Sequence, residues 1–183
     1  MDVSLDTDIT IHLYSAGREE LLFKYFDKLY MHEFVLEHEI RNKSTEIYKR
    51  IKEEQTNAVA LASTLGIAAL VTDDTKEYGP HDTLLKECVE DVIPFAFYEL
   101  LYLDYLVSED NFEQLLNEYN YINRIAYPKH PMSFNNRIKR VVGRFSSRGT
   151  KRDTIWMNNF CKERQIDYKH KMQCLLPHLK AME

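Results

Sequence analysis

The chain has 183 residues, of which 44% are hydrophobic and 29% are charged, and it contains only five Gly and five Pro. These proportions are typical of a folded globular protein and exclude a low-complexity chain, and the length suffices for one core domain with an extension. Residues 1–8 lack the basic region of a signal peptide, and no apolar run reaches the roughly 18 residues of a membrane span. We therefore expect a cytoplasmic protein without a membrane partner, whose three cysteines are reduced thiols.

The formal charge is distributed unevenly along the chain. Up to Pro128 there are 11 basic and 25 acidic residues, a net charge of −14, whereas from Lys129 onward there are 13 basic and 4 acidic residues, a net charge of +9. Such a division indicates two parts that meet different surroundings. We predict a core domain over residues 1–107 and a basic extension over residues 108–183.

In the first part, apolar patterns of strand and helix period alternate along the chain. Predicted strands cover residues 3–13, 29–34, 67–72 and 91–94. Ser15 is a candidate cap for the first helix and Ser44 for a later one. Predicted helices cover residues 18–29, 35–41, 44 onward, 54–65, 80–90 and 95–106. The alternation predicts an α/β fold with a parallel sheet flanked by helices.

Beyond Ser108 the pattern is helical only. Amphipathic helices are predicted over residues 112–126, 134–145 and 150–164, and residues 150–153 (TKRD) resemble a capping box for the last of these. The extension is therefore predicted to be all-helical as well as basic.

Acidic residues stand where predicted strands end or helices begin. They are Asp6 with Asp8, Glu39, Glu54, and the pair Asp73 and Asp74. In an open parallel sheet, ligands gather at the carboxyl ends of the strands, and carboxylate oxygens suit Mg²⁺ or Mn²⁺. The alternative is that each acid merely caps a helix or matches its dipole.

Four short segments, in this order, resemble the PIN-domain family, in its bacterial branch related to toxin nucleases. They are residues 5–9 (LDTDI), 38–40 (HEI), 54–62 (EQTNAVALA) and 70–74 (LVTDD). The family carries a first strand that ends in Asp-Thr, a mid-chain Glu, a Glu- and Ala-containing helix, and a strand that runs into Thr-Asp-Asp. The resemblance covers roughly the first 106 residues.

The resemblance implies a PIN-like fold and a Mg²⁺- or Mn²⁺-dependent endoribonuclease. The implied catalytic residues are Asp6, Glu39, Glu54 and Asp74, and the implied metal ligands are Asp6, Glu39, Asp73 and Asp74. It also implies RNA as substrate, with tRNA as one example, and an antitoxin or other inhibitory protein as a partner. A toxin or defence effector is the corresponding biological role, and a homo-oligomer stays open.

Cations and aromatic rings concentrate in the basic extension. Its candidate RNA-binding residues are Arg137, Lys139, Arg140, Arg144, Arg148, Lys151 and Arg152. Cations bind phosphates, and the nearby rings of Phe134, Phe145 and Trp156 can stack on unpaired bases. The alternative is that the extension docks on the acidic part of the same chain.

The sequence supports a zinc site less well than a Mg²⁺ or Mn²⁺ site. Residues 32–36 (HEFVL) have Leu where the HExxH motif needs His. His170, Cys174 and His178 share one face of a predicted helix, but Pro177 interrupts it and a fourth ligand is missing. Two functions are therefore weighed: a metal-dependent ribonuclease, and a catalytically inactive PIN-like module that binds RNA or a protein.

Overall fold

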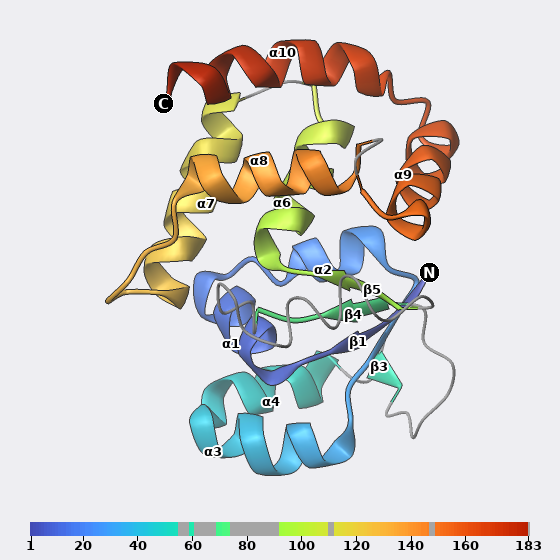
Figure 1. Cartoon of the computed structure of the whole chain (residues 1–183). Coiled ribbons are helices and arrows are strands. Elements are labelled where there is room, and N and C mark those ends of the chain that lie inside the picture. Colours follow the sequence, from blue (N-terminus) through green and yellow to red (C-terminus); the bar gives the residue numbers. More distant parts are fainter. Residues whose placement is uncertain (55–58, 61–68, 74–91, 110–111, 147–148, 183) are drawn as a thin grey trace. The chain divides into compact units, whose positions relative to one another are not determined.

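The computed structural model describes residues 1–54, 59–60, 69–73, 92–109, 112–146 and 149–182 (Figure 1). Contacts divide the chain into two units, Met1–Phe97 and Tyr98–Glu183, which we call the sheet unit and the helical unit. The domain boundary predicted at 107/108 lies at the end of helix α6, whereas the division between these units lies at its first residue. No helix in the described ranges is long and apolar enough to cross a membrane.

Among the described residues of the sheet unit, five strands form one all-parallel sheet in the order β3-β2-β1-β4-β5. The strands are β1 (Asp2–Leu5), β2 (Lys28–Tyr30), β3 (Val59–Ala60), β4 (Ala69–Val71) and β5 (Ile93–Phe95). Their apolar side chains are buried, as expected of a sheet covered on both faces; examples are Val3, Leu29, Val71 and Phe95. The predicted α/β class with a parallel sheet flanked by helices is confirmed.

Helices cover this sheet. They are α1 (Thr7–Ala16), α2 (Glu20–Tyr25), the π-helix η1 (Val35–Ile40), α3 (Arg41–Lys43) and α4 (Thr45–Glu54). Figure 1 shows the sheet between α2 on one side and α3 and α4 on the other. The predicted cap is present at Ser44, whose Oγ accepts a hydrogen bond from the N–H of Ile47 at 3.3 Å. Ser15 does not cap α2, which begins after Glu19 without a side-chain cap.

The strand predicted over residues 3–13 is wrong beyond Leu5. Asp6 ends β1 and caps α1, since its side chain accepts from the N–H of Thr7. Ile9 and Leu13, which also fit a period of two, are buried at helical spacing. Gly17 then ends α1 in the left-handed region, at φ 61°, which glycine adopts without steric cost.

Two further predictions fail because sheet pairing overrides local helix propensity. The helix predicted over residues 18–29 ends at Tyr25, and Leu29 instead pairs with Val3 of β1. Within the helix predicted over residues 54–65, Val59 and Ala60 form the edge strand β3, which pairs with β2. The rest of that segment after Glu54, and the helix predicted over residues 80–90, lie outside the described residues.

The helical unit follows the sequence prediction closely. Its helices are α6 (Phe97–Val107), α7 (Phe112–Ala126), α8 (Phe134–Arg144), α9 (Lys151–Glu163) and α10 (Tyr168–Ala181). The predicted cap of α9 is confirmed, since the hydroxyl of Thr150 accepts from the N–H of Asp153 at 3.2 Å. Tyr102, Tyr119 and Leu175 are fully buried in its core.

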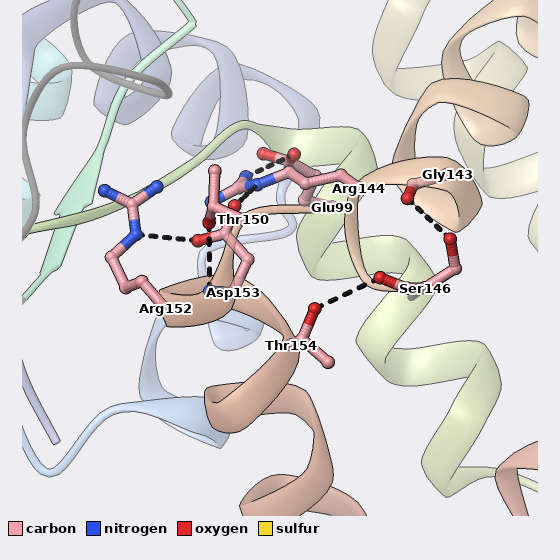
Figure 2. Close-up of polar contacts among 8 residues, drawn as sticks. All are labelled: Glu99, Gly143, Arg144, Ser146, Thr150, Arg152, Asp153 and Thr154. Atoms are coloured by element: carbon pink, nitrogen blue, oxygen red, sulfur yellow. Dashed lines mark hydrogen bonds and ion pairs between the residues drawn. The ribbon is translucent and has the colours of Figure 1, made fainter. Parts of the chain in front are cut away.

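A buried ion-pair network joins three of these helices (Figure 2). Arg144 of α8 donates to Glu99 of α6 at 2.5 Å and to Asp153 of α9 at 2.7 Å, and Arg152 donates to Asp153 at 2.8 Å. Glu99 and Asp153 have side chains only 1% exposed. Burial opposes the charged form of Asp153, but its hydrogen bonds to the two arginines outweigh that effect and lower its pKa. The four side chains together carry no net charge, which allows them to be buried.

Candidate functional site

Asp6 links the carboxyl ends of two neighbouring strands. It follows β1, and its backbone N–H donates to the carbonyl oxygen of Val71 at the end of β4 at 3.0 Å. One carboxylate oxygen, Oδ1, accepts from the N–H of Thr7, and the other, Oδ2, accepts from the hydroxyl of Thr72, each at 2.7 Å. The half-buried carboxylate is therefore held at the carboxyl edge of the sheet.

Glu39 reaches the same place from the π-helix η1. The hydroxyl of Thr7 donates to Oε2 of Glu39 at 2.5 Å, while the N–H of Thr7 donates to Asp6. Thr7 itself is buried, at 2% exposure, so it holds both carboxylates from the protein interior. The structure thus brings together the predicted residues Asp6 and Glu39, although 33 positions separate them in the sequence.

Asp73, predicted as a metal ligand, is engaged by the protein itself. Its Oδ1 accepts from the N–H of Phe97 at 3.0 Å, and its Oδ2 lies 2.8 Å from Nδ1 of His12. Burial raises the pKa of Asp73 above its usual value, because the side chain is only 1% exposed. A carboxylate that is closed to solvent is poorly suited to bind a cation, so the proposed ligand set does not include Asp73.

His12 is a partner of Asp73 that the sequence interpretation missed. It lies on α1, within residues 3–13, which the sequence pattern predicts as a strand. In a helix capped at Asp6, His12 lies one turn after Asp8 on the same face. This placement would have indicated His12 as a partner for an acid such as Asp73, which follows the neighbouring strand β4. Asp8 itself is half-exposed and pairs with Lys43 at 2.8 Å.

The remaining predicted acids are only partly described. Asp74 lies outside the described residues, and so does the side chain of Glu54, the last residue of α4. Within the described ranges no three His, Cys, Asp or Glu side chains form a group that could hold a metal ion. The described part therefore contributes a pair, Asp6 and Glu39. Both carboxylates bond to Thr7, and oxygen is the donor type that Mg²⁺ and Mn²⁺ prefer.

Several of the predicted RNA-binding residues make ion pairs or ring contacts inside the helical unit. Arg144 is committed to Glu99 and Asp153, and Arg152 to Asp153. Arg137 is only 5% exposed and lies over the ring of Tyr98, 5.6 Å from its centroid. Arg137 and Arg144 are thus buried in the helical unit, at 5% exposure and at 9% exposure of the side chain, and are poorly placed to contact RNA phosphates.

The other cations of the predicted set differ in exposure. Arg140 and Lys151 are exposed and Lys139 is half-buried, while Arg148 lies outside the described residues. The rings of Phe134 and Phe145 belong to the core rather than to a surface, at 5% and 3% exposure. Among the members of this set that the structure describes, Arg140 and Lys151 are best placed to bind a polyanion.

The possible zinc ligands of α10 are seen in part. Pro177 lies inside the helix, which continues through it, and Nε2 of His170 lies 3.8 Å from Sγ of Cys174. His178, however, stacks on the ring of Phe112, with a centroid distance of 4.3 Å. Two donors alone do not make a structural zinc site, which takes four ligands.

Comparison of the chain with models of known protein families, with curated proteins and with solved structures finds no match.

Proposed function

We propose that this protein is a Mg²⁺- or Mn²⁺-dependent endoribonuclease whose active centre contains Asp6 and Glu39, with Asp74 as a further ligand. The observation that supports this most is the placement of both carboxylates on Thr7, at the carboxyl edge of a parallel sheet. The resemblance to the PIN-domain family and the order of the acidic residues point to the same chemistry.

In this proposal the chain's own residues orient the ligands. Thr7 and Thr72 hold Asp6 through one hydrogen bond to each carboxylate oxygen, and Thr7 holds Glu39 through a third. These bonds reduce the rearrangement needed when a cation and a phosphodiester bind. When bound, the metal ion would lower the pKa of a water molecule and stabilise negative charge on the leaving oxygen.

Metal removal tests this proposal. We expect cleavage of a structured RNA such as tRNA to stop in excess EDTA and to return when Mn²⁺ or Mg²⁺ is added above the chelator concentration, because the carboxylates alone would repel the phosphate. The measurement is the rate of product formation on denaturing gels. Undiminished cleavage in EDTA would contradict the proposal, and RNA binding without cleavage in either metal would favour the inactive binding module.

The exposed cations of the helical unit are proposed to hold the RNA. We expect the double variant Arg140→Ala/Lys151→Ala to bind RNA more weakly, and the slope of log K against log salt to fall by about 1.4, or about 0.7 for each lost phosphate contact on single-stranded RNA. The rate with saturating RNA should change little, since such contacts supply uniform binding. A matched control is Lys28→Ala/Lys49→Ala, which removes two exposed cations from the sheet unit. Equal effects of the two double variants would show that net charge, and not this surface, governs binding.

A further inference from the structure

His170 and Cys174 form a pair of metal-binding side chains on helix α10. They are four residues apart, about one turn of the helix, and Nε2 of His170 lies 3.8 Å from Sγ of Cys174. His170 is exposed and Cys174 is half-buried. The two donor atoms therefore lie next to each other at an accessible part of the helical unit.

The separation of these donor atoms suits a single Zn²⁺ ion. In a tetrahedral site, a sulfur at about 2.3 Å and a nitrogen at about 2.0–2.1 Å from the ion are about 3.6 Å apart. The distance of 3.8 Å between Sγ and Nε2 is close to that value, so a small side-chain rotation lets both atoms bind one ion. Two ligands at i and i+4 of a helix bind one zinc ion in the HExxH motif as well. His170 and Cys174 thus supply half of a four-ligand site.

A second copy of the chain would supply the other half. Within the described ranges, no third His, Cys, Asp or Glu side chain joins the pair in a group that could hold a metal ion. His178, one turn further along α10, stacks on the ring of Phe112. Two copies related by a two-fold axis bring the same two donors each, and together they make the Cys₂His₂ set of a structural zinc site.

The surface around the pair allows a second copy of α10 to come close. Pro177 and Ala181 continue the spacing of His170 and Cys174 along one face of the helix, and both are exposed. The buried side chains of α10 lie on the opposite face; they are Met172, Leu175 and Leu179. The outer stripe is therefore uncharged, and its small residues leave room for the same stripe of a partner.

Charge makes this association depend on the metal. Lys169 and Lys180 are exposed on the same helix, and the chain from Lys129 onward carries a net charge of +9. Two copies that meet through α10 therefore repel each other. When zinc binds, the thiol of Cys174 in each copy loses its proton to solvent, and the two thiolates neutralise the ion, while neutral imidazoles add no charge. The metal thus links the copies at a site without net charge.

We infer that His170 and Cys174 bind Zn²⁺ together with the same two residues of a second copy, so that zinc joins two chains. The thiolate and imidazole donors select zinc over Mg²⁺ and Mn²⁺, which prefer oxygen. The inference goes beyond the proposed nuclease function and does not rest on it, since the site uses neither Asp6 nor Glu39.

Sedimentation equilibrium of the full chain tests the inference. The buffer contains a phosphine reductant, which keeps Cys174 from forming a disulfide. We expect a monomer in EDTA and a dimer in Zn²⁺. At free zinc of about a hundred times its dissociation constant for the site, the dissociation constant of the dimer should be about a hundredfold lower than without zinc.

Variants assign the effect to the pair. Cys174→Ser and His170→Ala each remove two of the four ligands from the dimer and should abolish the effect of zinc, whereas Cys174→His replaces one zinc donor by another and should retain it. His130→Ala, at an exposed position of the helical unit, is the matched control for loss of a histidine and should dimerise like wild type. Circular dichroism checks that each variant is folded.

Three results would overturn the inference: a wild-type protein that stays monomeric in zinc, a zinc-dependent dimer that persists in Cys174→Ser, or a dimer that needs no zinc and disappears on reduction. The last would be a disulfide between two copies of Cys174. RNA cleavage in Mg²⁺ or Mn²⁺ is measured separately, so failure of the proposed nuclease function leaves this test intact.

Discussion

Replacement of Asp6 by Asn is expected to slow metal-dependent RNA cleavage by about a thousandfold or more, comparable to the loss of one strong electrostatic contact at a reacting centre. The substitution removes a negative charge and one oxygen donor from the proposed cation site. It keeps the shape of the side chain, and Asn is as good a helix N-cap as Asp. Its amide can accept from the N–H of Thr7 and donate to the hydroxyl of Thr72, so the fold should persist.

The measurements for Asp6→Asn are the single-turnover cleavage rate and the affinity for Mn²⁺ by calorimetry, both of which should fall. Asp8→Asn is the matched control, because it removes the same charge two residues away on α1 from a half-exposed side chain that pairs with Lys43. If Asp6→Asn cleaved RNA at the wild-type rate, Asp6 would be a helix cap and nothing more.

Replacement of Arg144 by Ala is expected to destabilise the helical unit by about 3–5 kcal/mol, as when one member of a buried ion pair is removed. The reason is that the carboxylates of Glu99 and Asp153 are each only 1% exposed and would lose the guanidinium that compensates their burial. Asp153 would keep its ion pair with Arg152. The stability of Arg144→Lys should lie between those of wild type and Arg144→Ala, since an ammonium group lacks the planar fork with which a guanidinium reaches both acids.

Urea unfolding followed by circular dichroism measures this effect, and Arg140→Ala on the same helix is the control for loss of an exposed cation. Arg140→Ala should change the free energy of unfolding by less than about 0.5 kcal/mol, as is usual for surface substitutions. An equally small effect of Arg144→Ala would mean that Glu99 and Asp153 find other partners or take up protons at little cost.

Asp6 could be placed from the sequence because its position depends on few contacts, whereas the expectation for Glu39 rests on the family resemblance. An acid that follows an apolar strand lies at the carboxyl edge of a parallel sheet, wherever that strand began. The extent of the strand was harder to predict, since Ile9 and Leu13 fit both a period of two and a helical period. Asp6 caps a helix and so decides for the helical period, but this role becomes clear only from the bond that its side chain accepts from the N–H of Thr7.

Partners that are distant in sequence could not be predicted in this way. Arg144 pairs with Glu99 across 45 positions, and His12 with Asp73 across 61. Composition makes Arg144 one of many cations in a basic segment, and nothing in its local sequence distinguishes it from the exposed Arg140. Whether a charge faces solvent or a buried acid depends on how α6, α8 and α9 pack, which is a property of the tertiary structure.

The π-helix that carries Glu39 makes the proposed centre sensitive to chain length as well as to residue type. The N–H of Arg41 bonds to the carbonyl oxygen of Leu36, five residues back, so this turn contains one residue more than an α-helical turn. Loss of a single residue from this turn would restore the α-helical spacing, and the residues within the turn, Glu39 among them, would shift around the helix axis while the flanking segments stayed nearly in register. Such a shift would move Glu39 relative to Thr7, from whose hydroxyl it now accepts, because the fully buried Leu36 and Ile40 hold this helix in the core. In evolution, substitutions at the outward positions of η1 would therefore be tolerated, whereas a one-residue deletion would separate the glutamate from the aspartate.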